Sequence, residues 1–158
     1  MAIYSLRMSA VGKTTQKQPF TAAAHIKYIT RKEAVTTVLS ARMPGVRRQA
    51  IVWMKKEERD DRKNARVIDK IVVALPRELS SDAQQALVTA FAEELTRGRA
   101  SWLAAFHTKG KDRNNPHCHI VLRDRDVESG RRVMFLSAGK KEAAQKAAKG
   151  EKAPTTLQ

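Results

Sequence analysis

Three of the four histidines in this chain of 158 residues lie within thirteen positions, at His107, His117 and His119. Successive side chains of a β-strand point to opposite faces, so His117 and His119 are predicted to project together while Cys118 points away. The apolar run that follows His119 favours a strand, and Pro116 is acceptable only at the start of that strand. This pair of imidazoles is therefore a candidate metal chelate.

A third ligand is predicted from the apolar run at residues 101–107, which ends in His107. Residues 108–115 contain no apolar side chain, so the two runs are expected to be antiparallel strands joined by a loop that returns His107 to the other two histidines. Three neutral imidazoles leave coordination positions open for a water or a substrate oxygen. The expected cofactor is one divalent ion (Mn, Mg, Zn, Co or Ni). The alternative is that the histidines are unrelated surface or hydrogen-bonded residues.

The charge balance indicates a polyanionic partner. Lysine and arginine number 31 against 16 acidic residues, which gives a net charge of +15 and a pI near 10.5. Such an excess attracts nucleic acid first and an anionic membrane surface second. No stretch approaches the roughly 20 apolar residues of a spanning helix, and no secretory signal is recognised. With a single cysteine, Cys118, interpreted as a small core residue, the chain is expected to be cytoplasmic.

A metal held by imidazoles on a basic domain suits phosphodiester cleavage, because the ion polarises a phosphate oxygen and neutralises developing charge. The nucleophile is then either a water activated by the ion, as in a plain nuclease, or a side-chain hydroxyl that becomes covalently linked to the nucleotide. Of the two tyrosines, Tyr4 is expected to pack within a first strand. Tyr28 lies beside Lys27 and Arg31 on an accessible helix face, where cations favour the phenolate and attract phosphate.

The surrounding elements predict one α+β domain at residues 1–138, an antiparallel sheet of about five strands covered by helices in a two-layer sandwich. Residues 9–19 are expected to form a loop, and residues 42–66 an exposed, partly helical excursion of mixed charge. Residues 139–158 are expected to be a basic tail or the start of a linker. Four strands can be located in the sequence, at residues 2–8, 67–75, 101–107 and 117–124.

Two helices are predicted. The first covers residues 20–29 with Thr21 as its N-cap, and the second begins after Ser80 or Ser81 and is stopped by Gly98. The apolar stripes expected to face the core are Ala22, Ile26 and Ile29 in the first helix and Leu87, Phe91 and Leu95 in the second.

Segments at residues 2–4, 23–31, 74–79 and 107–119 resemble the MobA/MobL family of plasmid mobilization relaxases, which are HUH endonucleases. The Asn-Pro-His-Cys-His run at residues 115–119 is the most specific of them. The resemblance implies an enzyme that nicks one DNA strand at an origin of transfer, stays joined to the 5′ end through a tyrosine, and later reseals the strand. It assigns the nucleophile to Tyr28 and the metal ligands to the three clustered histidines.

The implied partners are single-stranded DNA at the origin of transfer and accessory relaxosome proteins, and the chain is expected to be an isolated relaxase domain. Two alternatives remain open: a rolling-circle replication initiator of the same chemistry and a non-catalytic, metal-stabilised DNA-binding domain. The tyrosine precedes the histidine motif, which is the order of relaxases rather than of initiators. Phosphate contacts are expected from Lys13, Lys27, Arg31, Lys109, Lys111 and Arg113.

The chain departs from the family pattern just before residues 74–76. Some relatives carry a glutamate there, whereas this chain has Ile71, Val72 and Val73, and Asp69 is the nearest acid. No general base is therefore nominated. His25, one turn before Tyr28, is expected to be a surface residue with a hydrogen bond, although it could orient the tyrosine.

Overall fold

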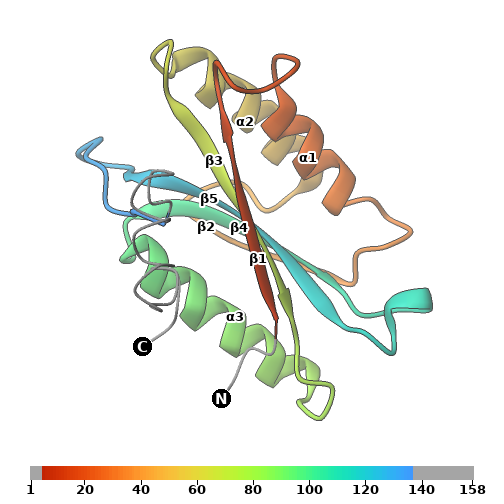
Figure 1. The fold of residues 1–158 in the computed structure, drawn as a ribbon. Coiled ribbons are helices and arrows are strands. Elements are labelled where there is room, and N and C mark those ends of the chain that lie inside the picture. Colours follow the sequence, from red (N-terminus) through yellow and green to blue (C-terminus); the bar gives the residue numbers. More distant parts are fainter. Residues whose placement is uncertain (1–4, 137–158) are drawn as a thin grey trace, which may run out of the picture.

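The computed structural model describes residues 5–136, which form one five-stranded antiparallel sheet with helices on both of its faces (Figure 1). The strand order is β1-β3-β5-β4-β2, so β5 lies at the centre and β1 and β2 form the edges. The strands are β1 (Leu6–Gly12), β2 (Thr37–Ala41), β3 (Arg66–Ala74), β4 (Ala100–His107) and β5 (His117–Asp126). The helices are α1 (Thr21–Ile29), α2 (Arg47–Asp60), α3 (Ser81–Thr96) and a short 3-10 helix, η1 (Gly110–Asp112).

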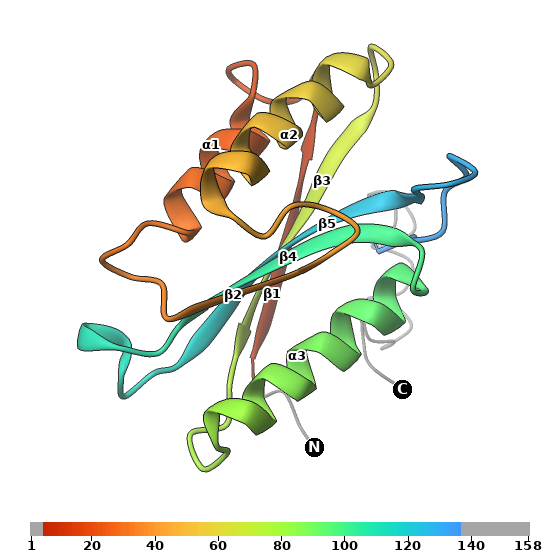
Figure 2. The same cartoon turned by 180° about the vertical axis from the view of Figure 1, so that it is seen from behind.

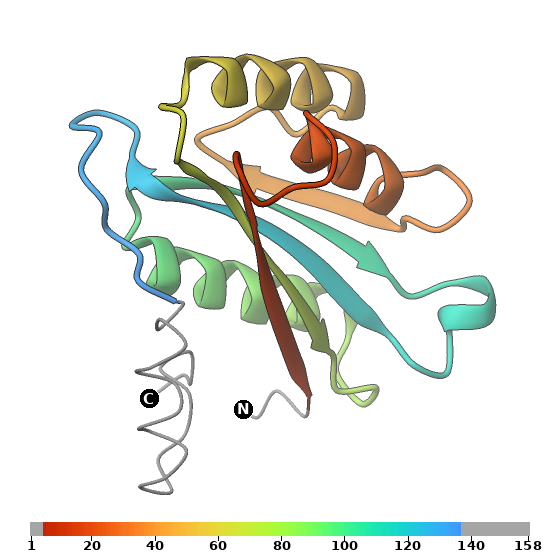
Figure 3. The same cartoon turned by 45° about the horizontal axis from the view of Figure 1, so that its top comes forward.

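The α+β class and the five antiparallel strands agree with the expectation from the sequence. Helices α1 and α2 lie side by side over one face, and α3 covers the other (Figures 2 and 3). The described residues therefore stack as helix, sheet and helix, one layer more than the expected sandwich. Tyr4 and the predicted basic tail at 139–158 lie outside the described residues.

On one face of the sheet, apolar side chains of α3 pack against apolar side chains of the strands. Phe91 of α3 is 2% exposed and belongs to a cluster with Cys118, Ile120 and Leu122 of β5. Burying a side chain of this size stabilises the fold by about 1.5–3 kcal/mol. On the opposite face, the buried side of α1 packs into a second cluster with α2 and the sheet. Its members include Ala22, Ile26 and Ile29, as predicted from their spacing.

Two strand predictions were wrong. Strand β1 continues through residues 9–12, which were expected to be a loop, because their backbone pairs with β3 despite few apolar side chains. Strand β2 was not located in the sequence at all. It is a short edge strand whose five residues are all only half-buried, so it carries little hydrophobic alternation, and its pairing with β4 is what makes it a strand.

The helix ends were predicted with mixed success. Ser80 caps α3 as expected, its hydroxyl accepting a hydrogen bond from the Ala83 amide at 3.1 Å. Thr21 is not an N-cap; it is the first helical residue, and its hydroxyl donates to the Gln18 carbonyl. The core stripe of α3 is also rotated from the prediction. Val88, Phe91 and Ala92 are buried, whereas Leu87 and Leu95 are half-buried.

No helix among residues 5–136 combines the length and the apolar character that crossing a bilayer requires.

Candidate active site

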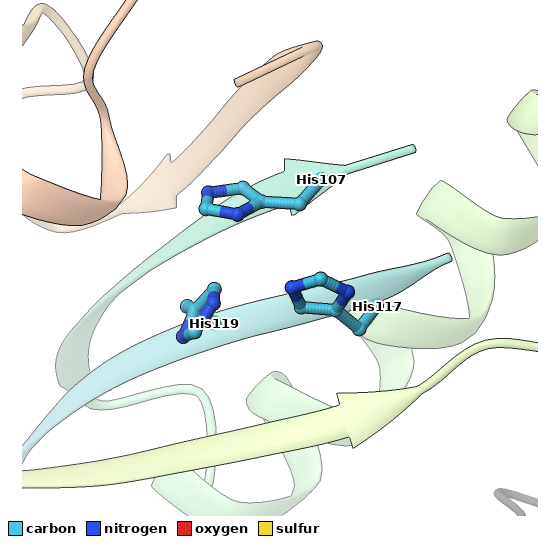
Figure 4. Close-up of side chains that lie close together, drawn as sticks. All are labelled: His107, His117 and His119. Atoms are coloured by element: carbon cyan, nitrogen blue, oxygen red, sulfur yellow. The ribbon is translucent and has the colours of Figure 1, made fainter. Parts of the chain in front are cut away.

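The register of the two central strands brings the three histidines together. His107, the last residue of β4, pairs directly with His117, the first residue of β5, and His119 pairs with Ala105. The three rings face one another above the sheet (Figure 4). Their centroids are 4.6 to 5.2 Å apart, and one nitrogen from each ring lies within 4.8 Å of the others. The structure therefore brings all three predicted metal ligands into one cluster.

Two backbone carbonyls fix the orientation of two of the rings. Nε2 of His107 lies 2.7 Å from the Ile29 carbonyl, and Nδ1 of His117 lies 3.0 Å from the Asn115 carbonyl. A carbonyl oxygen can only accept, so each of these nitrogens carries the hydrogen and donates. This leaves the Nδ1 lone pair of His107 and the Nε2 lone pair of His117 available. Such second-nitrogen hydrogen bonds to carbonyls are typical of metal-binding histidines.

The third ring has a nitrogen without a partner. Nδ1 of His119 is buried and makes no hydrogen bond within the part of the chain that the structure describes. Burial, followed by the neighbouring His107 and His117, lowers the pKa of His119 to about 3. Burial also lowers the pKa of His107. Neutral rings with free lone pairs at neutral pH fit a divalent cation well.

Helix α1 runs alongside this cluster. Its last residue, Ile29, supplies the carbonyl that holds His107, and the His25 ring lies 6.3 Å from the His119 ring, centroid to centroid. Burial, followed by the charge of Lys70, lowers the pKa of His25 to about 4. His25 therefore lies against the cluster instead of forming the surface hydrogen bond that was the preferred expectation.

Tyr28 belongs to the same turn of α1 as His25 and Ile29. Its side chain is 59% exposed, as expected from the helical spacing. The Arg31 guanidinium lies 4.1 Å from the centre of the phenol ring and also donates to the Tyr28 carbonyl. A cation over the ring face keeps a positive charge close to the phenol. An accessible hydroxyl with a cation beside it is thus presented from the helix that flanks the histidines.

The predicted phosphate contacts divide into two groups. Lys111 and Arg113 are exposed on or beside η1, the turn between the two histidine-bearing strands, and Lys27 is exposed on α1. Lys109 lies in the same turn, where its ammonium donates to the Lys32 carbonyl. Lys13 lies elsewhere, because its ammonium donates to the carbonyls of Asp61 and Arg59 at the end of α2.

Arg7 and Lys70 also lie beside the histidines, and neither was proposed from the sequence. Arg7 lines two adjoining hollows that both reach His119, and Lys70 lines the second of them. A signal was present at residues 5–9, where Ser5, Arg7 and Ser9 alternate with apolar residues. Arg7 already lay within the strand expected at residues 2–8, but the pairing of that strand with β3, which places Arg7 beside the histidines, could not be read from the sequence.

Asp69, the nearest acid in the sequence, points to the wrong face to serve the histidines. On β3 its side chain points to the face opposite that of Lys70. This is the face of Ile71 and Val73, which pack in the apolar cluster under α3. Its carboxylate pairs with Arg66 at 2.8 Å, and burial raises its pKa. The residue opposite His119 on β3 is Val72. The family glutamate thus has no substitute in Asp69.

The fold and the cluster define an α+β domain with three clustered histidines that could hold a metal ion. A sequence model of the MobA/MobL family matches residues 13–158, and the chain belongs to this family. Mobilization protein A of Escherichia coli is 33% identical over 131 residues, which cover 79% of this chain and 18% of that protein. A probable mobilization protein MobA of Bifidobacterium longum (strain NCC 2705) is 31% identical over 149 residues, 81% of this chain and 26% of that protein. The chain thus spans about a fifth to a quarter of the curated relatives it matches.

A solved structure described as the molecular basis of vancomycin resistance transfer in Staphylococcus aureus has a similar fold. The TM-score is 0.58 at 20% sequence identity, and the match covers 88% of this chain and 79% of that chain. This similarity supports the α+β architecture described above.

Proposed function

We propose that this domain is a metal-dependent relaxase that nicks single-stranded DNA at a plasmid origin of transfer through attack by Tyr28. One observation carries the proposal: three imidazoles converge at 4.8 Å or less beside the end of the helix that presents an exposed tyrosine. Membership of the MobA/MobL family and the net charge of +15 support a DNA substrate.

The reaction can be written with this chain's own groups. The phenol oxygen of Tyr28 attacks the scissile phosphorus, and the bond from phosphorus to the 3′ oxygen breaks. The 3′ oxygen takes up a proton from solvent and leaves as a hydroxyl, while the phenol proton passes to solvent. The product is a 5′-phosphotyrosyl link, and attack by a 3′ hydroxyl on that link reseals the strand. The Arg31 guanidinium, 4.1 Å from the centre of the Tyr28 ring, attracts the phosphate.

His107, His117 and His119 would hold the metal ion. The observation that best supports this role is that the buried Nδ1 of His119 has no hydrogen-bond partner among the described residues. When bound, a divalent ion supplies Lewis-acid polarisation of a phosphate oxygen. The two carbonyls that hold His107 and His117 keep those rings oriented for this role. Three neutral ligands are compatible with Mn, Mg, Zn, Co or Ni, and metal titration would identify the ion.

The test is a cleavage assay on single-stranded oligonucleotides that tile a transfer origin. Wild type, Tyr28→Phe and His119→Ala would each be incubated with Mn²⁺ and with a chelator. We expect wild type to cleave only with the ion and to form a denaturant-resistant adduct with the 5′ product. Both variants should lose cleavage by about a thousandfold or more.

Each alternative gives a different result in the same assay. Cleavage that survives Tyr28→Phe would point to a nuclease that uses water as its nucleophile. Tight binding without scission for every divalent ion would indicate a structural metal in a non-catalytic DNA-binding domain. A rolling-circle initiator would form the adduct with oligonucleotides from a replication origin but not with those from a transfer origin.

A further inference from the structure

We propose that Arg7 and Lys70 bind neighbouring backbone phosphates of the DNA strand and form an anion track across β3 and β1, next to the histidines. This inference rests on the proposed function, because it takes the bound polyanion to be the strand that the site cleaves. Both residues lie outside the sets of metal ligands and nucleophile described above.

The register of three strands places the two cations beside the cluster. His119 of β5 pairs with Val72 of β3, and Val72 pairs in turn with Arg7 of β1. Lys70 pairs with Ser9, so Arg7 and Lys70 are diagonal neighbours, a geometry with about 7–8 Å between Cα atoms. Alternate residues of a strand share a face, so both cations are on the histidine side of the sheet.

Two hollows connect these cations to the histidines. A hollow of about 220 Å³ is bordered by Arg7, Val72, His117 and His119. A second, of about 320 Å³, is bordered by Arg7, His25, Lys70, Val72 and His119. The two share Arg7, Val72 and His119, so they form one continuous surface depression. Strand β1, whose Arg7 borders both hollows, is an edge strand of the described sheet.

The depression carries uncompensated positive charge. No acidic side chain borders either hollow, and between Ser5 and Leu136 no ion pair or hydrogen bond engages the side chains of Arg7 or Lys70. By contrast, the guanidinium of Arg123 on β5 is paired with the Asp61 carboxylate at 2.8 Å. Cations left unpaired at the rim of a site attract anions from solution.

A nucleic acid backbone fits this arrangement better than a small anion. Ser5, just before β1, and Arg7 and Ser9 within it place polar side chains at every second position, which extends the polar surface beyond the two cations. Contacts of this type go to phosphates, so they carry no base information, and they would fix the position of the strand relative to the histidines.

The test measures binding without cleavage. All variants carry Tyr28→Phe, and their affinity for a fluorescent single-stranded oligonucleotide is measured by anisotropy over a range of salt concentrations, with Mn²⁺ and with a chelator. We expect Arg7→Gln with Lys70→Gln to weaken binding about tenfold or more. Each lost phosphate contact should lower the salt dependence, the slope of log affinity against log salt, by about 0.7.

Two controls keep the result specific. Arg131→Gln removes an exposed charge beyond the far end of β5 and should change affinity less than about twofold. The charge-preserving pair Arg7→Lys with Lys70→Arg should keep the wild-type slope, which separates charge from folding. An unchanged slope in the Gln pair, or an equal loss in Arg131→Gln, would overturn the proposal. Because this experiment measures binding and not cleavage, either outcome leaves the assignment of Tyr28 to be judged by the cleavage assay alone.

Discussion

The two faces of the sheet differ in what they bury, although the same strands form both. From β5, Cys118, Ile120 and Leu122 point into the apolar cluster under α3, and each is fully buried. His117 and His119, which flank Cys118, point to the opposite face and are half-buried. One strand thus serves as core on one side and as the floor of the candidate site on the other.

The α1 side is not polar throughout. Val121 follows the histidines on the same face of β5 and belongs to the cluster under α1 and α2. The polar surface around the histidines lies at one end of the sheet, where β1 and β3 meet the histidine-bearing end of β5. This separation implies that substitutions on one face of β5 change stability, whereas those on the other change metal binding and cleavage.

The largest expected effect is on cleavage. His119→Ala should lower single-turnover cleavage by about a thousandfold, yet change the free energy of unfolding in a chelator by less than about 1 kcal/mol. The stability change is small because the lost ring already has a buried nitrogen without a partner among residues 5–136. Cleavage and urea unfolding measured on the same preparation check this. A large loss of stability would show that the ring is part of the core.

The adjacent substitution should reverse the pattern. Ile120→Ala removes a fully buried side chain from the α3 face and should lower the free energy of unfolding by about 2–5 kcal/mol. The affinity of the folded protein for Mn²⁺, measured by titration calorimetry, should stay within about twofold of wild type. Loss of metal binding in fully folded Ile120→Ala would mean that the two faces are coupled.

Cys118→Ser sharpens the comparison at the position between the two histidines. Cys118 is fully buried, and burial raises the pKa of its thiol. A serine hydroxyl placed there should cost about 1–3 kcal/mol of stability. Cleavage by the folded variant should be unchanged, because the thiol points away from the site. Reduced cleavage with unchanged stability would assign Cys118 to the site instead.

Acid should destabilise the metal-free protein because two histidines on the α1 face of the sheet, His25 and His119, become protonated more readily in the unfolded state. The pKa of His25 is lowered to about 4 and that of His119 to about 3, whereas unfolded histidines titrate near 6.5. Below that value the unfolded state binds more protons than the folded state, so stability falls as the pH decreases from about 6.5 toward 3–4. Unfolding free energies at about pH 7 and pH 5 should differ more in wild type than in His119→Gln. Equal differences would contradict the assigned environment of His119.

The histidine cluster and the two faces of α1 could be predicted from the sequence, because both depend on residues that are close together in the chain. The two-residue spacing of His117 and His119, and the short polar link back to His107, define the cluster because β4 and β5 are joined by one tight connection. The buried side of α1 and the exposure of Tyr28 likewise follow from helical spacing.

Features that depend on contacts between segments far apart in the sequence could not be predicted from the sequence. Arg7 reaches the histidines only because β1 pairs with β3 and β3 pairs with β5, across more than a hundred residues of sequence. The orientation of Asp69 depends on which face of β3 meets α3. Strand β2 exists through its contacts with β4.

The most direct measurement is peptide mapping of the protein after reaction with a single-stranded origin oligonucleotide and Mn²⁺. After nuclease trimming, we predict a nucleotide mass on the peptide that contains Tyr28 in wild type, and no such mass in His119→Ala. A nucleotide attached to any other residue, or strand cleavage with no attached nucleotide, would contradict the proposal that Tyr28 and the three histidines act on one phosphate.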